Sequence, residues 1–254
     1  MKIRDTEGLE KYIEQKLKNY WTPEQIAGRL KWKCGETIIS AKSIYAYVYG
    51  FQGQHLCQYL TYKRYRRNRG AIRKRGWGKT IKNRVFIDNR PTVVNERTRF
   101  GDFEADTLGA IRTDKEVLTG MTERISRFLL LQKVSRLKYS MDGFKKSLNP
   151  YHNLVQTVTL DNGVENHRHE ELNIATYFCH PFSSWEKGTI ENLFGRLRRF
   201  IPKKKSLKNY SPEKISAIMD IMNNTPRKCL DYRTPAEVFK EQLSSPSVAL
   251  EGKM

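Results

Sequence analysis

Three acidic side chains stand where the sequence predicts the end of a strand or the start of a helix. The run TVTL at 157–160 is rich in β-branched residues and is followed by an Asp-Asn-Gly turn, which predicts a buried strand ending at Asp161. Open α/β sheets bind their ligands at the carboxyl ends of such strands. Asp106 lies near the end of another predicted strand, at 102–108, and Glu191 lies in the first turn of a predicted helix. Carboxylates gathered in this way suit a hard cation such as Mg²⁺, which prefers oxygen ligands.

Paired cations held by such acids can support phosphodiester chemistry. Two divalent ions about 3.5–4 Å apart activate the attacking oxygen and stabilise the leaving oxygen. A simpler interpretation also fits, because an aspartate in an Asp-Asn-Gly turn is a common turn residue and the helix dipole favours an acid in the first turn. The spacing alone leaves both interpretations open.

The elements that would position these acids follow from the periodicity of apolar residues. The helix is predicted to begin at Gly188, and its buried stripe has helical spacing: Ile190, Leu193, Phe194 and Leu197. Glu191 lies at the border of this stripe, so it can point over the edge of the sheet. On the strand, Asp102, Glu104 and Asp106 share one face, and Asp106 is nearest the carboxyl end.

Four segments resemble the signature blocks of a known family. In chain order they are GDFEADT (101–107), TLDNGVE (159–165), YFCHPFSSWEKGTIENLFGRLRRFIPK (177–203) and NNTPRKCLDYRTPAEVF (223–239). They resemble the IS-thirty family of bacterial insertion-sequence transposases, within the retroviral-integrase-like DDE superfamily. The resemblance implies an α/β fold: a ribonuclease-H-like mixed sheet with flanking helices, preceded by a small all-α helix-turn-helix domain.

The same resemblance implies the chemistry. The family's catalytic and metal-binding triad falls on Asp106, Asp161 and Glu191, with 54 residues between the first two and 29 between the last two. It implies two Mg²⁺ ions, for which Mn²⁺ can substitute, and a DNA transposase that cleaves insertion-sequence ends and transfers the freed strand. Because transposition joins two ends in one complex, we expect a homo-oligomer, at least a dimer.

The chain departs from the family pattern in several places. The interval before Glu191 is a few residues shorter than in the family, Phe103 stands where Trp is usual, and Asn166 stands where an aromatic residue is usual. Family members resemble longer proteins with an additional N-terminal helix-turn-helix, which we expect this chain to lack. These departures motivate an alternative: an inactive or truncated transposon remnant that acts as a DNA-binding regulator.

The composition favours a nucleic-acid partner. The 254 residues have a formal net charge of +20 and a pI near 9.8, so we expect a polyanion such as double-stranded DNA to neutralise them. No apolar run approaches the length of a membrane span, the N-terminus does not resemble a secretory signal, and the cysteines lack zinc-site spacing. We therefore expect a cytoplasmic, nucleoid-associated bacterial protein with no membrane partner and no structural zinc.

Residues 1–56 are predicted to form a helix-turn-helix DNA-binding domain. The block WTPEQIAGRL contains a capping box in which Thr22 is the N-cap and Gln25 closes the box. The recognition helix is predicted at 40–49, and both blocks resemble the family's second helix-turn-helix. The residues expected to contact DNA from this helix are Lys42, Ser43 and Tyr45. A small helical bundle used for protein contacts is the alternative.

Residues 57–92 are predicted to form a basic linker arm laid along DNA. Arginines and lysines crowd this stretch without an acid until Asp88, and aromatic residues are interleaved with them. A solvated charge run is the alternative, but unopposed like charge of this density favours a polyanionic partner. The expected phosphate contacts are Arg64, Arg66, Arg67, Arg73, Lys74 and Arg75.

Residues 93–243 are assigned to the integrase-like catalytic core with its C-terminal helices, and 244–254 to a disordered tail. The predicted strands lie at about 102–108, 117–123, 127–133, 155–160 and 175–178, and a helix at 140–148 crosses between parallel strands. Arg124, in a Thr-x-Glu-Arg sequence, is expected to be either an ion-pair partner or a DNA contact. The expected DNA contacts near Glu191 are Lys187, Asn192 and Arg198. For Lys187 and Asn192, packing or helix capping is the alternative.

The predicted reaction is metal-dependent phosphoryl transfer on DNA. Water attacks first and frees a 3′-hydroxyl at the element end, and that hydroxyl then attacks target DNA. Only the resemblance supplies the strand-transfer step, because carboxylates and charge suit a nuclease equally well. A carboxylate-pair hydrolase such as a glycosidase is a further alternative, against which the basic arm and the third acid argue.

Overall fold

A computed structural model describes residues 3, 6, 8–60, 81–109, 113–181, 183–203 and 205–244 of the chain. The predicted phosphate contacts between Arg64 and Arg75 and the predicted tail after Ser244 lie outside these residues. The chain divides into two compact units, and the first combines Met1–Lys74 with Asn224–Val238. The second combines Arg75–Asn223 with Phe239–Met254.

The described part of the first unit includes three short helices around one apolar core. They are α2 (Leu9–Lys18), α3 (Pro23–Cys34) and α4 (Ala41–Tyr49). The predicted capping box of α3 is present, because Thr22 accepts from the backbone N–H of Gln25 while the Gln25 side chain accepts from the backbone N–H of Thr22. Ile13, Ile26 and Ile44, one from each helix, are fully buried, so the three helices share a single core.

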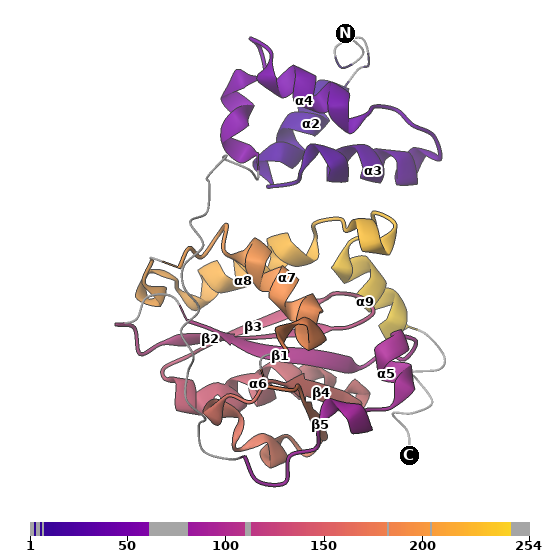
Figure 1. Ribbon diagram of the computed structural model, residues 1–254. Helices are drawn as coiled ribbons and strands as arrows, with labels where there is room; N and C mark the ends of the chain where they lie inside the picture. The colour runs from indigo at the N-terminus through magenta and orange to yellow at the C-terminus, as the bar shows by residue number, and fades with distance from the viewer. Residues whose placement is uncertain are drawn as a thin grey trace. The chain divides into compact units, whose positions relative to one another are not determined.

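The second unit is built on a five-stranded mixed sheet. Its strands are β1 (Asp102–Leu108), β2 (Val117–Glu123), β3 (Leu129–Val134), β4 (Thr157–Leu160) and β5 (Ala175–Phe178). Their order in the sheet is β3-β2-β1-β4-β5 (Figure 1). β2 is antiparallel to both β1 and β3, and β4 is parallel to both β1 and β5. This order and these directions are those of a ribonuclease-H-like sheet, so the predicted fold class is confirmed.

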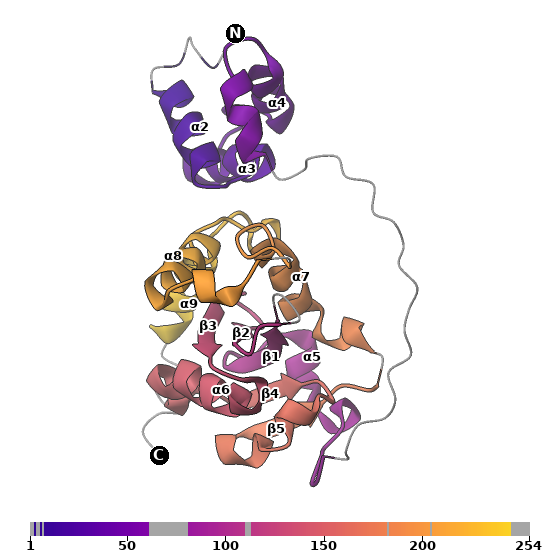
Figure 2. The ribbon, with the colours of Figure 1, turned by 90° about the vertical axis from the view of Figure 1, so that its left-hand side faces the viewer.

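Helices cover both faces of this sheet and bury two separate apolar clusters. α6 (Ser140–Leu148) lies on one face, and α7 (Gly188–Leu197) and α8 (Pro212–Asn223) lie on the other (Figures 1 and 2). Because side chains alternate along β1, Phe103 packs in the α6 cluster and Leu108 packs in the α7 cluster. Glu104 and Asp106 therefore point to the face that α7 covers. The remaining helices are α5 (Thr92–Glu96) and α9 (Pro235–Leu243).

A glycine allows α7 to approach the sheet beside Asp106. Gly120 of β2 is the residue opposite Asp106 of β1. A Cβ at Gly120 would lie 2.5 Å from the ring of Phe194, which belongs to the buried stripe of α7. A side chain at this position would therefore displace the ring of Phe194.

The two outer strands have partners other than strands. The side-chain amide of Asn223, at the end of α8, accepts from the N–H of Leu129 and donates to its carbonyl, each at 2.8 Å. The N–H of Leu131 donates to the sulfur of Met219 at 3.3 Å. At the other edge, the N–H of Phe178 donates to the carbonyl of Val85 at 2.8 Å. These contacts explain Asn223, for which the sequence offers no chemical role.

None of the helices in the described part of the chain is long and apolar enough to cross a membrane.

Candidate active site

Asp106 and Asp161 meet at the carboxyl ends of two neighbouring strands, β1 and β4. β1 and β4 are parallel neighbours in which Glu104 lies opposite Thr159, and this register, continued by two residues, sets Asp106 opposite Asp161. The ammonium group of Lys187 lies between the two carboxylates. The Nζ atom of Lys187 is 3.3 Å from Oδ2 of Asp106 and 3.7 Å from Oδ2 of Asp161.

Both carboxylates are oriented by neighbouring donors. The backbone N–H of Thr107 donates to Oδ1 of Asp106 at 2.7 Å. The amide of Asn166 donates to Oδ1 of Asp161 at 2.7 Å, and the N–H of Gly163 reaches the same oxygen at 3.2 Å. In each case the donor holds Oδ1, so Oδ2 is the atom that faces the cation.

Lys187 is buried, which agrees with the packing role that was the alternative to a DNA contact. Its side chain is 3% exposed, and Nζ also donates to the carbonyl of Ala105 at 3.1 Å. Burial lowers the pKa of this ammonium, but the Asp106 and Asp161 carboxylates outweigh that effect and the net pKa is raised. Lys187 therefore stays charged and acts as the counter-ion of the acid pair.

Glu165, which is not among the predicted site residues, is a third carboxylate near this pair. It lies in a 3-10 turn (Val164–Asn166) directly after the Asp-Asn-Gly sequence, and its Oε1 is 3.4 Å from the hydroxyl of Thr107. Burial raises its pKa, and the charges of Asp161 and Asp106 raise it further. The signal that could have found it is its place four residues after Asp161, in the block TLDNGVE.

Glu191 is not part of this group. It lies in the first turn of α7, as predicted, and its side chain is exposed. Among the residues that the structure describes, no three His, Cys, Asp or Glu side chains lie close enough together to hold a metal ion. The structure thus brings together two of the three predicted triad residues.

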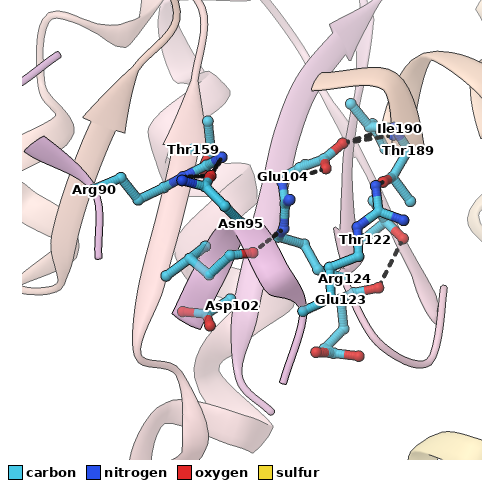
Figure 3. A network of polar contacts seen from close by, with 12 residues as sticks. Arg90, Asn95, Asp102, Glu104, Thr122, Glu123, Arg124, Thr159, Thr189 and Ile190 are labelled. Atoms are coloured by element: carbon cyan, nitrogen blue, oxygen red, sulfur yellow. Dashed lines mark hydrogen bonds and ion pairs between the residues drawn. The ribbon is translucent and has the colours of Figure 1, made fainter. Parts of the chain in front are cut away.

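A buried ion pair fixes the helix that carries Glu191 (Figure 3). Glu104 accepts from Nη1 of Arg124 at 2.7 Å through one oxygen. Through the other it accepts from the backbone N–H groups of Thr189 and Ile190, at 2.9 and 3.0 Å. These N–H groups belong to the first turn of α7 and have no partner within the helix, so the carboxylate caps it. Arg124 is therefore an ion-pair partner, one of its two expected roles.

The same region holds a second arginine (Figure 3). Arg90 donates to the hydroxyl of Thr159 at 2.9 Å and also bonds the side-chain oxygen of Asn95. Arg124 additionally donates to the carbonyl of Val94 at 3.1 Å. These bonds tie the segment around α5 to β1 and β4, the two strands that carry the aspartates.

The remaining predicted DNA contacts occupy different environments. On α4, Lys42 and Tyr45 are exposed, whereas the hydroxyl of Ser43 lies 2.9 Å from that of the N-cap Ser40. On α7, Asn192 is exposed and accepts from Arg196 at 3.1 Å. Arg198 follows the helix and donates to the carbonyl of Gly109 at 2.8 Å.

Comparison with known proteins decides the family. No protein-family model matches the chain. It is 36% identical over 253 residues to the transposase for insertion sequence element IS4351 of Bacteroides fragilis, a match that covers 96% of this chain and 76% of that protein. It is also 30% identical over 249 residues to transposase InsI for insertion sequence element IS30A of Escherichia coli. The chain belongs to the IS30 family of transposases. The family predicted from the four signature blocks is confirmed.

A third insertion-sequence transposase matches the chain over a similar length. The transposase for IS1086 of Cupriavidus metallidurans is 34% identical over 249 residues, covering 93% of this chain and 72% of that protein. The match to the Escherichia coli protein covers 91% of this chain and 64% of that protein. Among solved structures, the catalytic core domain of BIV integrase is similar with a TM-score of 0.41 and 18% identity, over 56% of this chain and 95% of that domain.

Proposed function

We propose that this IS30-family transposase binds insertion-sequence ends and catalyses metal-dependent DNA cleavage and strand transfer. The catalytic and metal-binding residues in this proposal are Asp106, Asp161 and Glu191. The observation that carries it is the convergence of Asp106 and Asp161 on the ammonium group of Lys187, at the carboxyl ends of the parallel strands β1 and β4. Family membership supplies the choice of DNA as substrate.

The acid pair fits a hard divalent cation. Both ligands are carboxylate oxygens, both already share a positive charge, and their Oδ1 atoms are held by donors that leave Oδ2 available. We propose that Asp106 and Asp161 hold Mg²⁺, or Mn²⁺ in its place, and that Glu191 joins them from the first turn of α7. When bound, such ions supply Lewis-acid activation of the attacking oxygen and stabilisation of the leaving oxygen.

The chain's own residues supply positioning. Asn166 and Gly163 orient Asp161, while Thr107 orients Asp106. Glu104 holds the start of α7, so Glu191 is presented from a helical turn whose backbone is fixed. Orientation of this kind lowers the cost of arranging the reacting groups at the moment of reaction.

The charge of the chain supports DNA as the partner. Its formal net charge is +20, and Lys42 and Tyr45 are exposed on α4, the predicted recognition helix. We propose that α4 contacts the insertion-sequence end and that Asn192 and Arg198 contact DNA beside the acid pair. Since strand transfer joins two ends to one target, the proposed active form is a homo-oligomer acting on nucleoid DNA in the bacterial cytoplasm.

The test is cleavage and strand transfer on a labelled duplex that carries the element's own terminal repeat, with Mg²⁺ or Mn²⁺. Wild type is compared with Asp106→Asn, Asp161→Asn, Glu191→Gln and Glu165→Gln. Glu96→Gln removes an exposed carboxylate at the end of α5 and serves as the matched control. We expect metal-dependent product from wild type and the control, and loss of product from the three triad variants.

Three outcomes would redirect the proposal. Loss of product from Glu165→Gln together with activity in Glu191→Gln would assign the third ligand to Glu165. Tight binding of the terminal repeat with no product from wild type would contradict the transferase and support a DNA-binding regulator. Product that still forms in the presence of EDTA would contradict the proposed dependence on a divalent metal ion.

A further inference from the structure

Lys187 occupies the centre of the proposed metal site. Its ammonium nitrogen lies within 3.7 Å of one oxygen from each of Asp106 and Asp161, and its side chain is only 3% exposed. A carbonyl oxygen, that of Ala105, completes its contacts at 3.1 Å. Two carboxylates and a carbonyl form an oxygen-rich environment of the kind that divalent cations favour.

The charges show why an ion and this lysine compete. The two carboxylates carry two negative charges, and one ammonium neutralises only half of them. A divalent ion would neutralise both, but it would stand a few ångströms from the ammonium inside a partly buried site. Repulsion between these positive charges is large at such a distance where little water screens them. Lys187 and a divalent cation therefore exclude each other from the space between the Oδ2 atoms.

We infer that Lys187 is a built-in counter-cation, which fills the metal position in the metal-free protein and withdraws when a divalent cation binds. This inference rests on the proposed function, because it takes Asp106 and Asp161 as the metal ligands. The side chain of Asp161 is 43% exposed and that of Asp106 is 22% exposed, so the site is open to water on the Asp161 side. The ammonium can leave, and an ion can enter, from that side.

The withdrawal involves the helical turn that carries Glu191. Lys187 directly precedes α7, and Glu191 lies four residues later, in the first turn of that helix. The two side chains have opposite charge. The metal-free site thus takes its positive charge from this turn, and in the proposed loaded site the same turn supplies a negative ligand.

The first experiment measures Mn²⁺ affinity of the full chain without DNA, by titration calorimetry. Wild type is compared with Lys187→Met, which keeps an unbranched side chain one atom shorter and removes the charge. Lys145→Met is the charge-matched control, because Lys145 lies in an exposed ion pair with Glu171. We expect Lys187→Met to bind Mn²⁺ roughly tenfold more tightly or better, and the control to match wild type. An unchanged or weaker affinity in Lys187→Met overturns the inference.

The second experiment uses wild type alone, so it does not depend on how a variant folds. Surface lysines are acetylated with an amine-reactive ester, with and without saturating Mn²⁺, and each site is quantified by mass spectrometry. We expect Lys187 to be protected without the ion and labelled with it, while Lys145 is labelled equally in both. Protection of Lys187 that persists at saturating Mn²⁺ overturns the inference.

Asp106→Asn and Asp161→Asn separate this inference from the proposed function. If both variants bind Mn²⁺ as tightly as wild type, the proposed metal ligands are wrong and the inference falls with them. If both lose binding while Lys187→Met changes nothing, the metal site stands and only the role of Lys187 is wrong.

Discussion

Glu104 and Asp106 are two residues apart on the same face of β1, yet their surroundings differ. Glu104 is 0% exposed, and its two oxygens accept from Arg124 and from two backbone N–H groups of α7. Asp106 is partly exposed, and its only charged neighbour of opposite sign, in the described part of the chain, is Lys187, shared with Asp161. We call these the closed cluster and the open cluster. A carboxylate with saturated hydrogen bonds supports the fold, whereas one with spare capacity is available for chemistry.

The electrostatics of the open cluster agree with this distinction. Burial raises the pKa of Asp106, Lys187 opposes the rise, and the nearby charge of Asp161 adds to it, so that the net direction is upward. A raised pKa means that the ionised form lacks compensation. The open cluster therefore gains from any additional positive charge, while the closed cluster already has its own.

The largest expected difference is in stability. Glu104→Ala leaves Arg124 buried without its counter-ion and should cost about 3–5 kcal/mol of unfolding free energy. Asp106→Ala should cost about 1 kcal/mol, since Lys187 keeps Asp161 and Ala105 as partners. Urea denaturation of both variants measures the difference. Equal costs would mean that the two clusters do not differ in the way described.

A double-mutant cycle sharpens the description of the closed cluster. Glu104→Met and Arg124→Met should couple by about 0.5–3 kcal/mol, because removing both charges avoids the buried unpaired one. The double variant should still be less stable than wild type by about 1–3 kcal/mol, since the N–H groups of Thr189 and Ile190 lose their acceptor. Full recovery of stability would show that the cap on α7 is dispensable.

A substitution at Asn166 tests whether the orientation of the Asp161 carboxylate matters for activity. Removing the amide in Asn166→Ala takes away the 2.7 Å bond to Asp161 while leaving every carboxylate in place. We expect DNA cleavage to fall roughly 10-fold to 100-fold, as for other groups that orient metal ligands. Asn209→Ala, an exposed amide elsewhere in the unit, is the control and should cleave like wild type. Cleavage by Asn166→Ala at the wild-type rate would contradict the orienting role.

The reactivity of the Cys179 thiol measures how well the region beside Asp161 is shielded from solvent. The N–H of Cys179 donates to the carbonyl of Leu160, the residue before Asp161, and burial raises the pKa of its thiol to about 12. At pH 8 the thiolate fraction is then roughly 10⁻⁴. Native alkylation followed by mass spectrometry should label the exposed Cys34 and Cys229 and leave Cys179 unmodified. Rapid labelling of Cys179 would show that this region opens in solution.

The smallest expected effect is a pH dependence at His180. The ring lies 2.9 Å from Glu186 and 2.8 Å from Asp88, and the hydrogen bond to Glu186, with the nearby Asp88, raises its pKa. A raised folded-state pKa stabilises the protein fully below about pH 6.5, and the contribution is lost as pH rises through the folded-state value. From pH 6 to pH 8.5, wild type should lose about 1 °C of Tm relative to His180→Gln. A difference of opposite sign would contradict the ion pair.

The sequence predicts the scaffold of the site well, because periodicity determines which face a side chain occupies. Alternation in β1 and the β-branched run before Asp161 lead directly to two strand ends, and the stripe in α7 leads to the first turn that holds Glu191. The strands observed agree with those predicted except that β3 and β4 begin two residues later and β3 ends one residue later. These features depend on local patterns, which a sequence displays.

The partners of charged side chains could not be predicted in this way. Periodicity shows that Glu104 and Asp106 share a face, but it does not show that Arg124 saturates the first and Lys187 neutralises the second. For Lys187 the sequence left a DNA contact and a packing role both open, because the sequence does not show whether this side chain faces solvent. The proximity of Glu165 depends on the 3-10 turn after Asp161, whose path is set by tertiary contacts.

The edges of the sheet bear on how copies of this protein can associate. An outer strand with free peptide groups is a template for another chain, and proteins that gather at high local concentration are exposed to that hazard. At β3 the side chains of Asn223 and Met219 hydrogen-bond peptide groups of Leu129 and Leu131. At β5 the carbonyl of Val85 accepts from the N–H of Phe178. Copies of this chain at high local concentration are thereby discouraged from pairing strand to strand at these points.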